Sequence, residues 1–170
     1  MARTPTARQL DLLDRLTDLL LAEGFAHLTL DQMAGRLRCG STFGYLAYVG
    51  GRPAGWVNAS RRSDYGLYRD VDPHGPEPSS VIAVSCFVIA PPFRRHGIAA
   101  ALLDRVIADA AGRGAAWIEG YPHNRPEESD AAHFRGPRSM YDARGFVPVT
   151  VRERDTVVRL ASASACGARA

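Results

Sequence analysis

The pattern of hydrophobic and polar residues changes sharply within residues 81–113. Val81–Ala90 is an almost continuous run of apolar and β-branched residues, which is typical of a strand covered on both faces. After Pro91 and Pro92, apolar side chains recur at helical spacing, at Ile98, Leu102, Leu103, Val106, Ile107 and Ala110. We therefore predict a central strand followed by a long amphipathic helix.

The same patterning predicts strands on both sides of this unit. They are Phe43–Val49, Ala54–Ser60, Ala115–Tyr121, Phe146–Arg152 and Thr156–Leu160. A helix crosses from the central strand to Ala115–Tyr121, so these two strands should be parallel, whereas hairpins make the other pairs antiparallel. The expected fold class is α/β (α+β): a mixed, largely antiparallel sheet with a central parallel strand pair flanked by helices.

Domain organisation follows from where this patterning begins and ends. Residues 1–40 read as a helical segment, with one helix over Ala7–Glu23 and a second opened by a capping box at Thr29. Residues 41–160 form the main domain. The small and polar residues 161–170 are expected to be a disordered tail. The stretches Arg61–Ser80 and Pro122–Ser139 lack periodicity and are expected to be loops.

The residues that join the central strand to its helix form a short basic turn, Arg94-Arg95-His96-Gly97-Ile98-Ala99. Gly97 lets backbone N–H groups approach a ligand closely, and a helix N-terminus attracts anions. This turn predicts a phosphate-binding site.

Two motifs carry a resemblance to a known family. The order of strand, proline, Arg-x-x-Gly-x-Ala and long helix resembles the acyl-CoA-binding motif of the GNAT superfamily of N-acyltransferases. Ser139–Phe146 resembles the Tyr-x-x-x-Gly-Phe corner of the same superfamily, and the likeness covers about Phe43 to Leu160. It implies a GNAT-like fold and the direct transfer of an acetyl group from acetyl-CoA to a primary amine, without a covalent enzyme intermediate.

The resemblance also implies cofactor contacts. It sets main-chain groups of Phe87, Val88 and Ile89 beside the pantetheine arm, and Arg94, Arg95, His96, Gly97, Ile98 and Ala99 on the pyrophosphate. Asn124 matches a position that often contacts the pantetheine.

The resemblance assigns the acid step of the reaction to Tyr141, which would protonate the departing thiolate. A phenol is protonated at neutral pH and can donate a proton. The residues leave the general base open between Glu119, the carboxylate of its strand, and His123. Core packing explains Cys86 better than nucleophilic catalysis does.

A second resemblance points to another class of function. Leu10–Cys39 is similar to the first two helices of the helix-turn-helix domain of TetR-type transcription regulators. The alternative function is therefore a DNA-binding or regulatory module fused to an acyl-CoA-binding domain. It requires a recognition helix near Ser41–Tyr45. Gly40 and Gly44 weaken a helix there, and Phe43–Val49 reads better as a strand, so nucleic acid is not the expected partner.

Composition adds few constraints. The net charge of +3 fits a polyanionic cofactor as well as nucleic acid. Three scattered cysteines and five histidines have no metal spacing, so no metal is expected.

No apolar run is long enough to cross a membrane, and no secretory signal is evident, which makes a cytoplasmic location the expectation. Expected partners are a small-molecule or protein amine acceptor, with a homodimer as a further option.

Overall fold

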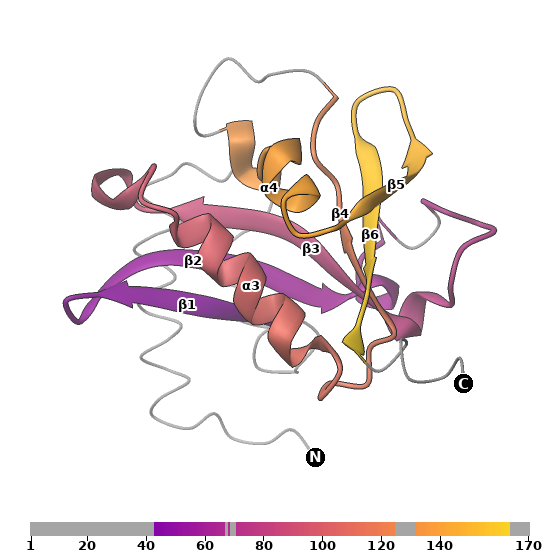
Figure 1. Cartoon of the computed structure of the whole chain (residues 1–170), viewed down its shortest axis with the longest axis horizontal. Coiled ribbons are helices and arrows are strands. Elements are labelled where there is room, and N and C mark those ends of the chain that lie inside the picture. Colours follow the sequence, from indigo (N-terminus) through magenta and orange to yellow (C-terminus); the bar gives the residue numbers. More distant parts are fainter. Residues whose placement is uncertain (1–42, 67, 69–70, 125–131, 164–170) are drawn as a thin grey trace.

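The computed structural model describes residues 43–66, 68, 71–124 and 132–163. Their strands form one sheet in the order β1-β2-β3-β4-β6-β5 (Figure 1). The strands are β1 (Gly44–Val49), β2 (Arg52–Arg61), β3 (Val81–Ile89), β4 (Trp117–Gly120), β5 (Val147–Val151) and β6 (Thr156–Ala161). The helices predicted within residues 1–40 lie outside the described residues.

Helices and short 3-10 turns join these strands. The α-helices are α3 (Ile98–Ala110) and α4 (Arg138–Asp142), and the 3-10 turns are η1 (Arg62–Asp64), η2 (Pro78–Ser80), η3 (Pro91–Phe93) and η4 (Ala132–Arg135). The strand pair β3 and β4 is parallel because α3 crosses between them, and the remaining pairs are antiparallel. The predicted fold class is confirmed, and the predicted strands are correct to within a few residues at their ends.

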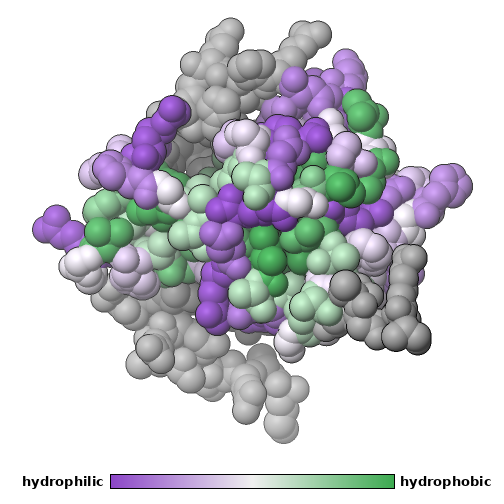
Figure 2. Space-filling model, in the orientation of Figure 1, coloured by the Kyte–Doolittle hydropathy of each residue, from purple (hydrophilic) through white to green (hydrophobic). Residues whose placement is uncertain are grey.

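One face of the sheet is covered by both α-helices. The apolar stripe of α3 packs against β1, β2 and β3, as the helical spacing predicts (Figure 1). The resulting core contains Leu102, Leu103 and Val106 of α3 together with Met140 and Tyr141 of α4. The outer side of this layer mixes hydrophilic and hydrophobic side chains without a dominant patch (Figure 2).

A smaller core lies on the other face of the sheet, beneath the segment between β2 and β3. Tyr65, Tyr68 and Val71 of this segment pack on Ala83, Tyr121 and Val157 of the sheet. The ring of Tyr68 stacks on that of Tyr121 with centroids 4.0 Å apart and an interplanar angle of 6°. The stretch expected to be a plain loop is therefore anchored through its aromatic rings.

The C-terminal end of the sheet differs from expectation. β6 runs to Ala161, which pairs with Trp117, and Ser162 behind it is buried with its hydroxyl donating to the Ala115 carbonyl. The sheet thus extends into the expected tail. Within the segment that a DNA-recognition helix requires, Gly44 and Tyr45 belong to β1 and pair with Asn58 and Val57, so the DNA-binding alternative gains no support.

The packing of α3 on the sheet generates a stability prediction. Leu103 is fully buried between the helix and the strands. Leu103→Ala should lower the free energy of unfolding by about 2–5 kcal/mol, because the cavity left behind adds to the lost burial. Urea denaturation measures this loss. Val151→Ala, at a side chain that is 75% exposed, should change stability by less than about 0.5 kcal/mol. Equal losses in the two variants would contradict this packing.

Candidate functional site

The site begins where the two parallel strands separate. Pairing between β3 and β4 runs from Val81 opposite Trp117 to Val84 opposite Gly120, and β3 then continues to Ile89. The two strands point in different directions beyond this register, and α4 lies in the angle between them (Figure 1). Among the described residues no strand pairs with β3 on its β4 side beyond Val84, which is the arrangement that an extended ligand could extend by main-chain pairing.

The three residues predicted to contact the pantetheine arm all lie in β3 beyond the end of its pairing with β4. Phe87, Val88 and Ile89 all lie in the continuing part of β3, and on the opposite edge they pair with Val57, Trp56 and Gly55 of β2. The strand is therefore held firmly on one side. A rigid strand with one open edge suits main-chain pairing with an amide-containing arm.

Tyr141 spans the gap between the strands. A Cβ at Gly120 on β4 would come within 2.2 Å of the Tyr141 ring, so the ring occupies the space that a missing side chain leaves. The phenol is fully buried and donates a hydrogen bond of 2.7 Å to the carbonyl of Arg135. Burial raises the pKa of the Tyr141 hydroxyl well above its ordinary value, so the group keeps its proton at neutral pH.

Cys86 of β3 lies on the other side of this gap. Burial raises the pKa of its thiol to about 12, with the positive charge of Arg135 opposing that rise. A thiol with this pKa is protonated at neutral pH and is a poor nucleophile. The packing interpretation of Cys86 is the one that its environment favours.

The basic turn follows β3 at the same end of the sheet. Gly97 has a φ of 78° and caps α3, and a Cβ there would meet nothing within 4 Å, so the turn is open to a ligand. Arg95 is exposed and also has a positive φ, of 64°. The Nε of Arg94 donates to the Ile89 carbonyl over 3.1 Å, which ties the turn to the end of β3. The residues from Arg94 to Ala99 therefore lie together around the N-terminus of α3.

The Asn124 side chain, a predicted pantetheine contact, forms hydrogen bonds within the protein. Its amide nitrogen donates to the Arg152 carbonyl over 2.6 Å, and its amide oxygen accepts from the Thr156 hydroxyl over 2.6 Å. Asn124 thus braces the β5–β6 hairpin in this state. A pantetheine contact from this side chain stays a prediction and would require it to exchange one of these partners.

Glu119 lies in a buried cage of hydrogen-bond donors. Its carboxylate has no exposed surface and accepts from Arg62 Nη1 at 3.0 Å, Arg159 Nε at 2.8 Å and the Tyr121 hydroxyl at 3.0 Å. Arg62 is itself only 1% exposed, and Arg159 also contacts Asp72. Two guanidinium groups surround this carboxylate and cover it. A general-base role for Glu119 stays a prediction, while this cage favours a structural role.

The ion pairs around Glu119 join two parts of the fold. Arg62 and Asp72 belong to the segment between β2 and β3, whereas Glu119 and Arg159 belong to β4 and β6. The ion pairs therefore fasten this segment, and with it the stacked ring of Tyr68, to the sheet. Arg62 and Tyr68 were not singled out from the sequence, because a pairing between residues 57 positions apart leaves no local pattern.

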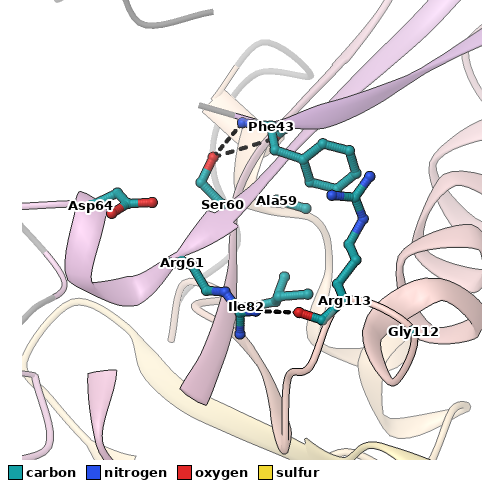
Figure 3. A pocket seen from close by; sticks show the side chains of 8 residues that line it. All are labelled: Phe43, Ala59, Ser60, Arg61, Asp64, Ile82, Gly112 and Arg113. Carbon is teal, nitrogen blue, oxygen red and sulfur yellow. Dashed lines mark hydrogen bonds between the residues drawn. The ribbon is translucent and has the colours of Figure 1, made fainter. Parts of the chain in front are cut away.

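The structure also contains a pocket of about 430 Å³ away from the strand separation. It is lined by Phe43, Ala59, Ser60, Arg61, Asp64, Ile82, Gly112 and Arg113 (Figure 3). The Arg113 guanidinium lies 3.2 Å from the centroid of the Phe43 ring, and Arg61 donates to the Arg113 carbonyl. Ile82 marks the beginning of β3, so this pocket lies at the opposite end of that strand from the basic turn.

Two further observations concern the part of the chain that the structure describes. It contains no group of three or more His, Cys, Asp or Glu side chains arranged to hold a metal ion. None of its helices is both long and apolar enough to cross a membrane.

The cage around Glu119 generates a prediction that tests its structural role. Glu119→Gln leaves buried arginines without their counter-charge and should cost about 3–5 kcal/mol of unfolding free energy in urea denaturation. Asp142→Asn, which breaks the exposed pair with Arg138, is the matched control and should cost about 1 kcal/mol or less. A Glu119→Gln protein of unchanged stability would contradict the structural role.

Comparison with known proteins adds the family. The model of the acetyltransferase (GNAT) family matches residues 11–146, which include part of the segment that resembles a helix-turn-helix regulator. A search of curated proteins finds no match.

Solved structures show the same fold. An aminoglycoside 6'-N-acetyltransferase complexed with coenzyme A aligns with a TM-score of 0.63 at 15% identity, covering 94% of this chain and 95% of that one. PaiA N-acetyltransferase from Thermoplasma acidophilum, in complex with coenzyme A, gives 0.59 at 10% identity, with 89% and 94% covered. The ribosomal-protein-S18-alanine N-acetyltransferase from Escherichia coli gives 0.54 at 18% identity, with 86% and 87% covered. With the family model spanning most of its length, the chain belongs to the GNAT family of acetyltransferases.

Proposed function

We propose that the protein transfers an acetyl group from acetyl-CoA to a primary amine by direct attack. The observation that carries this proposal is the coincidence of three features at one end of β3: an edge that no described strand pairs with beyond Val84, an open glycine turn and a buried phenol between the strands. Coenzyme A is named in two of the similar structures, which supports the same cofactor for this chain.

The fit to a CoA-type ligand follows from the turn and the strand. Backbone N–H groups of the first turn of α3 lack intrahelical partners, and the helix dipole adds about half a positive charge there. Arg95, exposed beside Gly97, supplies a full charge toward a pyrophosphate. The edge of β3 from Ser85 to Ile89 would pair with the pantetheine amides. The cofactor would supply an activated acetyl thioester at the inner end of this edge.

The reaction forms an N–C bond and breaks the C–S bond, and the sulfur leaves with the bonding electrons. Tyr141 holds a proton at its hydroxyl in the gap between β3 and β4, and we assign it the protonation of that sulfur. The amine must lose a proton to a base. We favour His123 over the caged Glu119 as this base. The His123 ring packs edge-to-face on Phe134. Phe134 directly precedes Arg135, whose carbonyl accepts the hydrogen bond from Tyr141.

The family and the fold fit both small-molecule and protein amines, and we expect the enzyme to work in the cytoplasm. All 21 of its Lys and Arg residues are arginine, so its own side chains offer no amine to acetylate.

Cofactor binding is tested by calorimetric titration with acetyl-CoA. Wild-type protein should bind. In Gly97→Ala the positive φ is strained by about 1–2 kcal/mol, which should weaken binding about 5- to 30-fold if the turn holds the pyrophosphate. Gly114→Ala carries the same kind of strain at the other end of α3 and should keep wild-type affinity. No binding at millimolar acetyl-CoA would sink the proposal.

The role of Tyr141 is tested by Tyr141→Phe. Removing the proton donor should lower kcat about a hundredfold or more while KM for acetyl-CoA stays near the wild-type value. Tyr48→Phe, at an exposed position of β1, is the control and should turn over normally. If Tyr141→Phe keeps wild-type kcat on a working acceptor, the phenol has no part in the chemistry.

A further inference from the structure

Arg135 brings a guanidinium group to the proposed reaction centre. Its backbone carbonyl accepts a hydrogen bond from the Tyr141 hydroxyl, so the backbone of Arg135 lies directly beside the phenol. Its side chain lies 5.9 Å from the centre of the Tyr68 ring, and its charge lowers the pKa values of Tyr68, Cys86 and Tyr141 against the effect of burial. An acceptor that reaches Tyr141 therefore comes within one side-chain length of Arg135.

Among the residues that the structure describes, the charges around Arg135 do not balance. Asp155 is its ion-pair partner, but that carboxylate already binds Arg152 through two hydrogen bonds, of 2.6 and 2.7 Å. Two guanidinium groups thus share one buried carboxylate, which leaves one positive charge in excess. The cage around Glu119 on the same face has equal numbers of each sign, since Arg62 and Arg159 face Glu119 and Asp72.

Arg135 also has a side-chain hydrogen-bond donor that no described residue uses. Its Nε is buried and has no hydrogen-bond partner among the described residues, although the side chain as a whole is 14% exposed. A buried N–H without a partner costs free energy, and an arginine presents several donors in one plane that match a carboxylate. The excess charge and the spare donor both favour an anionic group.

We propose that Arg135 binds a carboxylate of the acceptor, so that the substrate is an amine that also carries a carboxylate, such as a free amino acid. This inference rests on the proposed function and narrows its acceptor class. A carboxylate two or three bonds from the amine would be held by Arg135 while the amine faces the thioester near Tyr141. Polycationic amines would meet the excess positive charge and should be poor acceptors.

Matched acceptor pairs test this on the wild-type enzyme. Release of free thiol from acetyl-CoA is measured with a panel of L-amino acids and their α-amides, and with spermidine and kanamycin as polycations. We expect at least one amino acid with kcat/KM tenfold or more above its amide. The amide has the less basic amine and more of it unprotonated at neutral pH, so amine reactivity alone would give the opposite order.

Three variants then connect the preference to Arg135. Arg135→Gln should raise the acceptor KM at least tenfold and erase the difference between acid and amide, with KM for acetyl-CoA unchanged. Arg135→Lys keeps the charge and should retain part of the preference. Arg138→Gln, which removes an exposed arginine three residues away, should behave like wild type.

Several results would overturn the inference. It fails if amides or polycations are the better acceptors, if no carboxylated amine is acetylated, or if Arg135→Gln lowers kcat equally for both members of a pair. In each case acetyl-CoA would still bind, so the proposed function would stand. Absence of acetyl-CoA binding would instead remove both. The comparison of acid with amide needs only the wild-type protein and remains decisive should Arg135→Gln fail to fold.

Discussion

The pairing of β3 with β4 ends at Val84 and Gly120, and the remaining features of the site depend on this early end. Beyond it β3 pairs with β2 on one edge and with no described strand on the other, and the absence of a side chain at Gly120 lets the Tyr141 ring fill the gap. α3 contributes indirectly, because packing of its apolar stripe on the sheet fixes the glycine turn at the same end of β3. Tertiary packing thus brings together a strand edge, a helix N-terminus and a phenol that are remote in sequence.

Charged side chains form two unequal clusters in the described part of the chain. The cage of Arg62, Glu119, Arg159 and Asp72 is neutral and buried, and it fastens the segment carrying Tyr68. Buried ion pairs contribute little net stability but are costly to break, so this cage is best understood as fixing the position of that segment. The cluster around Arg135 keeps one positive charge beside the phenol. Electrostatics thereby distinguishes a supporting cluster from one that is able to recognise a ligand.

Much of the fold could be predicted from the sequence because its strands and α3 have strong periodicity, and the turn at Gly97 was found because its glycine and arginines are adjacent. The ion pairs were not predictable in the same way. Glu119 was expected to be a candidate base because a strand glutamate gives no sign of which side chains will meet it, and Arg62 reaches it from 57 residues away. Arg135 lies in a stretch without regular pattern, so only the backbone contact with Tyr141 reveals its position. Local patterns specify elements, whereas contacts between distant elements specify the chemistry of the site.

Hydrogen–deuterium exchange with and without acetyl-CoA tests most directly whether the separated strands form the cofactor site. Pairing of a bound pantetheine arm with β3 should slow exchange of backbone amides within Ser85–Ile89, and pyrophosphate binding should slow those of Gly97–Ala99. Amides of β5 and β6 should exchange at unchanged rates. Slowed exchange around Phe43 and Arg61 instead, or no change anywhere at saturating acetyl-CoA, would contradict the account.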